Sequence, residues 1–139
     1  MTIDASVWLA ARFDHEPDHP ASAACIVDAL TGAEPIVLPW LALAECVAAT
    51  ARKTGDDVLA LETGHQLRAL DSVRWITLDE EMAQASAAIA AACRVRAADA
   101  VYAAVAERFS ATLVTLDREL AERCSGRVRC VGPEGWARR

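Results

Sequence analysis

The sequence predicts an α/β fold, a three-layer α/β/α sandwich with a mostly parallel central sheet of about five short strands. Short apolar runs rich in branched residues, typical of buried strands, alternate with longer segments whose apolar residues recur at helical spacing. Parallel strands joined by helices form right-handed crossovers, which place helices on both faces of the sheet. The length of 139 residues and the apolar fraction of 54% predict one domain over residues 1–139.

The first elements are predicted from their end signals. Residues 2–3 form a short apolar strand, and Ser6 is expected to cap a helix that continues to Phe13. Pro20 suits the first turn of a second helix, and Gly32 is placed to end it. The chain is therefore expected to begin as strand, helix, helix.

The remaining elements follow from the same two patterns. They are expected as a strand over residues 35–39, helices over 40–53 and 57–70, a strand over 73–78, helices over 79–93 and 98–109, a strand over 112–116, a short helix to about Arg123, and a strand over 128–131. Residues 132–139 are expected to form a surface tail.

Composition excludes several classes of protein. No segment approaches the ~20 apolar residues of a membrane helix, and no basic leader or cleavage site precedes Asp4, so we expect no membrane partner and a cytoplasmic protein. The five cysteines are an odd number without C-x-x-C spacing. They predict reduced thiols rather than a disulfide framework or a zinc site.

The net charge of −6 disfavours a nucleic-acid partner, but the charge is unevenly distributed. Residues 1–93 hold 5 basic and 14 acidic side chains, whereas residues 94–139 hold 9 basic side chains, all arginine, and 6 acidic ones. Arginine makes bidentate contacts to phosphate that lysine cannot. Both a phosphate-binding rim and an ordinary solvated face remain open. The residues concerned are Arg94, Arg96, Arg118, Arg127 and Arg129.

Four acids stand out by their positions. Asp4 and Asp117 each follow an apolar strand, which predicts that they lie at the carboxyl edge of the sheet, where such folds bind ligands. Glu45 and Asp99 interrupt apolar helical surfaces, where acids are rare without partners. Two carboxylates ~5 Å apart repel by roughly 3 kcal/mol at an effective dielectric of 20, so a cluster requires cations. The alternative for the three aspartates is a helix cap or first-turn acid.

The same segments resemble a PIN domain. The family's D-x-S opening appears at Asp4-Ala5-Ser6, its helix-borne glutamate at Glu45, its Asp-Ala helix start at residues 98–106, and its T-x-D element at Thr115-Leu116-Asp117. In this order, the four motifs resemble more narrowly the VapC-type ribonuclease toxins of bacterial type II toxin–antitoxin pairs. The residue after the first aspartate, often threonine in that family, is Ala5 here.

The resemblance implies a metal-dependent endoribonuclease. Asp4, Glu45, Asp99 and Asp117 would be catalytic and bind Mg²⁺ or Mn²⁺, which suits hard oxygen ligands. Ser6 and Thr115 would support these ligands, and Arg94, Arg96 and Arg118 would contact RNA. The family also implies cleavage to a 5′-phosphate and a 3′-hydroxyl, translation arrest, neutralisation by a cognate antitoxin, and a homodimer.

Two alternatives remain open. A phosphohydrolase with an aspartyl nucleophile normally has a second aspartate two residues after the first and a later lysine, whereas this chain has Ser6 there and Lys53 as its only lysine. The other alternative is a catalytically inactive PIN-like module that binds RNA or a protein. Loss of a carboxylate would have indicated such a module, and all four are present.

Overall fold

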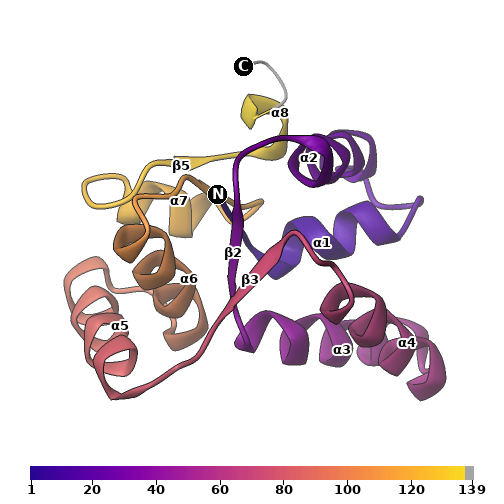
Figure 1. Cartoon of the computed structure of the whole chain (residues 1–139), viewed down its shortest axis with the longest axis horizontal. Helices are drawn as coiled ribbons and strands as arrows, with labels where there is room; N and C mark the ends of the chain where they lie inside the picture. Colours follow the sequence, from indigo (N-terminus) through magenta and orange to yellow (C-terminus); the bar gives the residue numbers. More distant parts are fainter. Residues whose placement is uncertain (137–139) are drawn as a thin grey trace.

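The computed structural model describes residues 1–136 and confirms the α/β fold class. Its strands are β1 (Thr2–Ile3), β2 (Ile36–Pro39), β3 (Val73–Ile76), β4 (Leu113–Val114) and β5 (Cys130–Val131). Its helices are α1 (Ala5–Arg12), α2 (His19–Thr31), α3 (Leu41–Thr54), α4 (Asp57–Arg68), α5 (Glu80–Cys93), α6 (Ala97–Arg108), α7 (Arg118–Cys124) and α8 (Pro133–Trp136). In Figure 1, α5, α6 and α7 lie on one side of the central strands, and α1, α3 and α4 lie on the other.

The strands pair in parallel throughout the described part of the chain. β1 pairs with β4 and β4 with β5, while β2 pairs with β3 in a second ladder. The two ladders meet where the Val37 amide donates a hydrogen bond to the Met1 carbonyl at 2.9 Å. The spatial order is therefore β3-β2-β1-β4-β5, and the carboxyl ends of all five strands face one edge.

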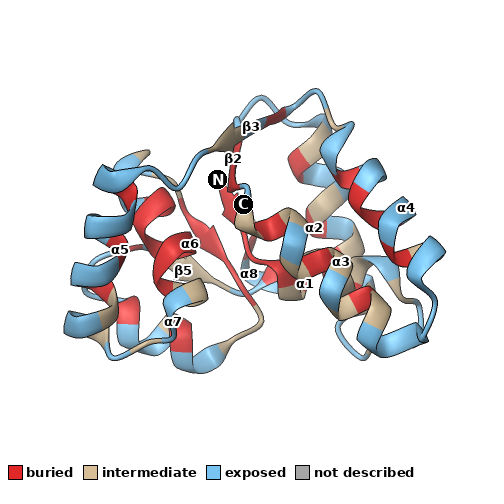
Figure 2. Cartoon of the chain, turned by 90° about the horizontal axis from the view of Figure 1, so that it is seen from below, coloured by how far each residue is buried: buried red, intermediate tan, exposed pale blue. Residues whose placement is uncertain are grey.

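Helix α6 is the buried centre of the fold. It packs against β1, β2 and β4, and α5 covers its outer side (Figure 2). All residues from Ala100 to Ala106 are buried, most of them alanine or valine. A helix that is apolar on every side is stable only when it is covered on every side. Its first turn carries Asp99, which this packing holds at the edge of the sheet.

Two local predictions were wrong at the start and end of the chain. Helix α1 begins at Ala5 with Asp4 at the N-cap position, so Ser6 lies inside the first turn and does not cap it. The predicted surface tail contains α8, in which Pro133 and Trp136 are buried and the Trp136 indole donates a hydrogen bond to Asp28 at 2.7 Å. Residues 137–139 of that predicted tail lie outside the described part.

The other elements match the predicted order, with shorter strands. β3 ends at Ile76 rather than at residue 78, and β4 contains two residues where five were expected. All five cysteines are free thiols, and three of them are buried. None of the helices within residues 1–136 has the length and apolar character needed to cross a membrane.

Candidate functional site

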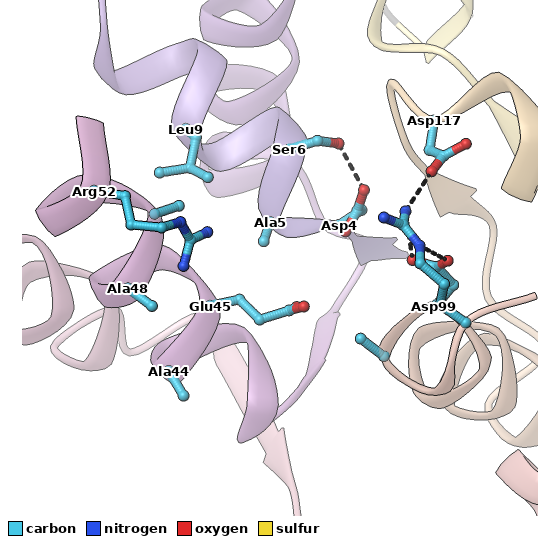
Figure 3. A pocket seen from close by; sticks show the side chains of 13 residues that line it. Asp4, Ala5, Ser6, Leu9, Ala44, Glu45, Ala48, Arg52, Asp99 and Asp117 are labelled. Carbon is cyan, nitrogen blue, oxygen red and sulfur yellow. Dashed lines mark hydrogen bonds and ion pairs between the residues drawn. The ribbon is translucent and has the colours of Figure 1, made fainter.

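Four carboxylates from separate parts of the chain line one open cavity of about 470 Å³ (Figure 3). Asp4 follows β1, and Asp117 comes after β4, the strand that pairs with β1. Glu45 extends from α3, and Asp99 lies in the first turn of α6. Parallel pairing brings the two strand ends together, as the sequence predicted, and the two helices add the remaining acids. Their role as metal ligands stays a prediction.

Asp4 is the most buried of the four acids, with an exposed fraction of 9%. Two hydroxyls donate hydrogen bonds to its Oδ2 atom, Ser6 Oγ at 2.6 Å and Thr115 Oγ1 at 2.8 Å. Burial raises the pKa of Asp4, and these two hydrogen bonds oppose the rise by stabilising the charged form. Ser6 and Thr115 therefore contact an acid of the site directly, which agrees with their predicted supporting position.

Thr115 also connects Asp4 to Asp117. Its Oγ1 atom accepts a hydrogen bond from the Asp117 amide at 3.0 Å, and Asp117 Oδ1 accepts one from the Leu120 amide at 3.0 Å. Asp117 is thus the side-chain cap of α7, so the capping alternative holds for this residue. Capping uses only the Oδ1 atom of Asp117, so its Oδ2 atom is available for other contacts in the site.

Glu45 lies in the middle of α3, where it cannot act as a cap. Its Oε2 atom is buried and has no hydrogen-bond partner among the described residues. Burial raises the pKa of Glu45, and the charges of Asp4 and Asp99 raise it further. The Tyr102 hydroxyl lies close to Glu45 but does not meet hydrogen-bond geometry. A buried carboxylate oxygen without a donor is the kind of group that a cation satisfies.

Within residues 1–136, Arg96 is the cation that forms ion pairs with these acids. Its Nε atom donates to Asp99 Oδ2 at 2.8 Å, and its Nη2 atom donates to Asp117 Oδ2 at 2.8 Å. These contacts are the dashed lines at Asp99 and Asp117 in Figure 3. The sequence predicted an RNA contact for Arg96, and the structure shows that its guanidinium bridges two acids of the site.

The donor chemistry of the cavity fits a divalent cation. Four carboxylates supply hard oxygen atoms, and one of those oxygens, Glu45 Oε2, is buried without a partner. In the arrangement that includes the Arg96 bridge, residues 1–136 contain no group of three His, Cys, Asp or Glu side chains placed to hold a metal ion. Binding of a metal therefore requires some rearrangement of these side chains.

The other arginines differ in their positions. Arg94 lines a hollow of about 250 Å³ that adjoins the cavity and shares Asp99 and Asp117 with it. Arg118 is exposed at the start of α7 and lines neither hollow. Arg127 forms an ion pair with Glu107 at 2.9 Å on the surface, which matches the alternative of an ordinary solvated face. Arg129 is exposed.

Two residues of the site were not singled out in the sequence. Arg52 lines the cavity and extends from α3 on the same side as Glu45 (Figure 3). Tyr102 is buried, and its hydroxyl lies beside Glu45. Both have a sequence signal, because Arg52 is seven residues after Glu45 and Tyr102 is three residues after Asp99. Helical spacing of three or seven places side chains on one face.

The raised pKa of Asp4 predicts that the contribution of this group to the stability of the metal-free protein falls as pH rises. A carboxyl whose pKa is higher in the folded than in the unfolded chain stabilises the fold fully below its unfolded pKa of about 4, and this contribution is lost as pH rises through the folded pKa. In EDTA at pH 7 we therefore expect Asp4→Asn to be more stable, by about 1 kcal/mol, the usual scale of a single substitution.

Urea unfolding of both proteins at pH 7 and near pH 3.5 measures this effect. The difference should disappear at the acidic pH, where Asp4 is protonated and resembles asparagine. Asp71→Asn is the matched control, because Asp71 is exposed and lies outside the cavity. Equal stability of Asp4→Asn and the unsubstituted protein at pH 7 would contradict the raised pKa.

Several solved structures share this fold, including the following three. VapC20 of Mycobacterium tuberculosis, described as a sarcin-ricin loop cleaving toxin, has a TM-score of 0.76 and 15% identity, over 91% of this chain and 95% of that one. FitAcB from Neisseria gonorrhoeae has a TM-score of 0.73 and 21% identity, over 95% and 96%. VapBC2 from Rickettsia felis, bound to a DNA fragment from its promoter, has a TM-score of 0.68 and 13% identity, over 94% and 96%.

At these identities the likeness shows the fold, which is that of VapC-type toxins. No curated protein matches the chain in sequence. The family model described as PIN domain matches residues 1–125. That match covers all four acids of the cavity as well as Ser6 and Thr115. The chain therefore belongs to the PIN domain family.

Proposed function

We propose that this protein is an Mg²⁺- or Mn²⁺-dependent endoribonuclease that acts as the toxin of a toxin–antitoxin pair. The observation that supports this most is that four carboxylates from different elements line one cavity, at the carboxyl edge of a parallel sheet in a PIN domain. Within residues 1–136, Asp4 and Glu45 form no ion pair with a basic side chain, so the cavity favours cations. One cavity of this kind supports phosphodiester hydrolysis better than it supports simple binding.

In this proposal, Asp4, Glu45, Asp99 and Asp117 hold the metal. When bound, Mg²⁺ or Mn²⁺ lowers the pKa of the attacking water and neutralises charge on the phosphate and the leaving oxygen. Ser6 and Thr115 orient Asp4 through hydrogen bonds of 2.6 and 2.8 Å to the same oxygen. These hydroxyls hold Asp4 Oδ2, which leaves its Oδ1 atom available to the metal.

RNA binding is assigned to Arg94, Arg96 and Arg118, which are all exposed. We expect Arg94→Ala and Arg118→Ala each to weaken RNA binding and to reduce the salt slope of log K by about 0.7, the value for one lost contact to a single strand. Titration of single-stranded RNA at several salt concentrations, in Ca²⁺ to slow cleavage, measures the slope. Arg127→Ala is the control, because Arg127 pairs with Glu107. Unchanged slopes would return both arginines to the solvated surface.

The proposed partners are a cognate antitoxin and a second copy of the chain. Two of the similar structures are toxin–antitoxin complexes, one from Klebsiella pneumoniae and the FitAB complex bound to a DNA fragment. Exposed apolar side chains on α2 and α4 are available for such contacts, and they include Val27, Val58 and Leu61. With an RNA substrate and an antitoxin as its partners, the protein would act in the cytoplasm.

Cleavage of single-stranded RNA by the purified protein tests the proposed activity. We expect cleavage in Mn²⁺ or Mg²⁺, no cleavage in excess EDTA, and fragments that carry a 5′-phosphate and a 3′-hydroxyl. Contaminating ribonucleases that use the 2′-hydroxyl need no metal and leave a 3′-phosphate, so the fragment ends separate the two sources. Sequencing of the 5′ ends after induction in cells identifies the RNA. Absence of metal-dependent fragments that carry a 5′-phosphate would count against the proposal.

A binding module without catalysis is the second candidate, and one observation favours it. Arg96 satisfies Asp99 and Asp117 with ion pairs of 2.8 Å each, so these two acids are compensated without a metal. A module that works by binding alone needs no metal to compensate these two acids. Metal binding separates the candidates, because the nuclease requires it and the module does not.

A further inference from the structure

The Arg96 bridge lies at the mouth of the cavity. The Arg96 side chain is 77% exposed, whereas the side chains of Asp99 and Asp117 are 15% and 26% exposed. The guanidinium therefore reaches two partly buried carboxylates from the solvent side. Its Nε and Nη2 atoms each donate to a different carboxylate at 2.8 Å, and Nη2 makes a longer contact of 3.4 Å to Asp99 Oδ1.

The acids of this bridge are held more firmly than the arginine. Asp117 is fixed by the Leu120 amide on its Oδ1 atom and by its own amide on Thr115. Asp99 lies in the first turn of α6, the most buried helix of the fold. Arg96 is at the N-cap position of the same helix, with a long side chain and no other side-chain partner among the described residues. Arginine is thus the part of the bridge that can move.

We propose that Arg96 is a tethered counter-cation that competes with the divalent metal for Asp99 and Asp117, and that metal binding frees its guanidinium for an RNA phosphate. The inference rests on the proposed metal site. Arg96 and the metal need the same carboxylate oxygens, and an oxygen held in a charge-assisted hydrogen bond is not available to a metal without displacement. The short distance along the chain keeps the arginine at high effective concentration.

The competition has a consequence for substrate binding. Because binding equilibria are reciprocal, a metal that releases Arg96 raises the affinity for phosphate, and phosphate that holds Arg96 raises the affinity for metal. Without metal, the bridge lowers the repulsion between the two acids and keeps the guanidinium away from RNA. A single arginine then links loading of the metal to binding of the substrate.

Calorimetric titration of Mn²⁺ into the metal-free protein tests the competition. We expect Arg96→Gln to bind Mn²⁺ roughly three- to tenfold more tightly, the range that fits the loss of two exposed ion pairs. Arg52→Gln is the matched control, because Arg52 lines the same cavity and forms no ion pair among the described residues. Arg52→Gln removes the same positive charge but breaks no ion pair with a carboxylate. The gain in Mn²⁺ affinity should therefore be smaller than the gain in Arg96→Gln. Arg96→Lys keeps the charge, but an ammonium group cannot contact both carboxylates as a guanidinium does. Its Mn²⁺ affinity should therefore lie between those of the unsubstituted protein and Arg96→Gln.

The melting temperature in EDTA is the second readout, and it does not depend on activity. Arg96→Gln should melt below the unsubstituted protein, because Asp99 and Asp117 then repel without compensation, and Mn²⁺ should restore its stability. Equal Mn²⁺ affinities in the unsubstituted protein and Arg96→Gln, or equal gains in Arg96→Gln and Arg52→Gln, would overturn the inference. If Arg96→Gln does not fold without metal, the same comparison between Arg96→Lys and the unsubstituted protein decides. Absence of Mn²⁺ binding in every variant would overturn the proposed function as well.

Discussion

Asp99→Asn should lower the rate of RNA cleavage by at least about 100-fold while the protein stays folded. Asp99 lines the cavity from the first turn of α6, and an amide in its place removes one of four negative ligands. Loss of a residue that only supports a metal ligand typically costs 10–100-fold in activity, so loss of a ligand should cost more. Initial rates on a single-stranded RNA in Mn²⁺ measure the effect, and circular dichroism verifies the fold.

Two further sets of variants make this test specific. Asp71→Asn makes the same change of charge on the exposed surface and should retain full activity. Ser6→Ala and Thr115→Val should lose roughly 10–100-fold, because both hydroxyls hold Asp4 in place through hydrogen bonds. A graded series of this kind is expected of a metal site. Full cleavage by a folded Asp99→Asn variant would remove Asp99 from the site.

The positions of Asp4 and Asp117 could be predicted because they depend on local patterns. Each follows a short apolar segment, and the carboxyl ends of parallel strands meet at one edge. Glu45 was marked by a charge in the middle of an apolar helix, where no cap is available. Periodicity predicted the order of the elements for the same reason, since it is a property of neighbouring residues.

Contacts between distant residues could not be predicted in this way. Arg96 reaches Asp117 across 21 residues, and Trp136 reaches Asp28 across 108 residues. Neither pair has a spacing that sets it apart from many others in the chain. The bridge required the fold to bring Arg96, at the start of α6, close to Asp117, at the start of α7. Helix α8 required α2 as a surface to cover.

The cap of α1 shows how the site changes a local rule. Serine is a strong helix cap, so Ser6 was the natural choice from the sequence. In the fold its hydroxyl instead donates to Asp4 and accepts from the Leu116 amide at 3.2 Å. Asp4 takes the N-cap position without using its side chain for capping. The site therefore uses both side chains that could have capped the helix, and the local preference is overridden.

Divalent cations should raise the melting temperature of the unsubstituted protein by about 5–10 °C. Folding brings Asp4, Glu45, Asp99 and Asp117 to one cavity, whereas the unfolded chain keeps them apart, so cations should bind the native state alone. At a free metal concentration 100 times the dissociation constant, such binding adds about 2.7 kcal/mol to the free energy of unfolding. For a domain near this size, that gain corresponds to the stated shift. Thermal unfolding with millimolar Mn²⁺ or Mg²⁺, and again after EDTA, measures it.

Asp4→Asn separates metal binding from a general effect of salt. Its melting temperature in EDTA should exceed that of the unsubstituted protein, because a buried charge with a raised pKa is gone. The increment produced by metal should largely vanish, since one ligand is lost, while Asp71→Asn should keep it. A general effect of salt would instead stabilise all three proteins alike. A melting temperature that ignores both cations, together with no heat of binding, would leave the binding module as the better description of this PIN domain.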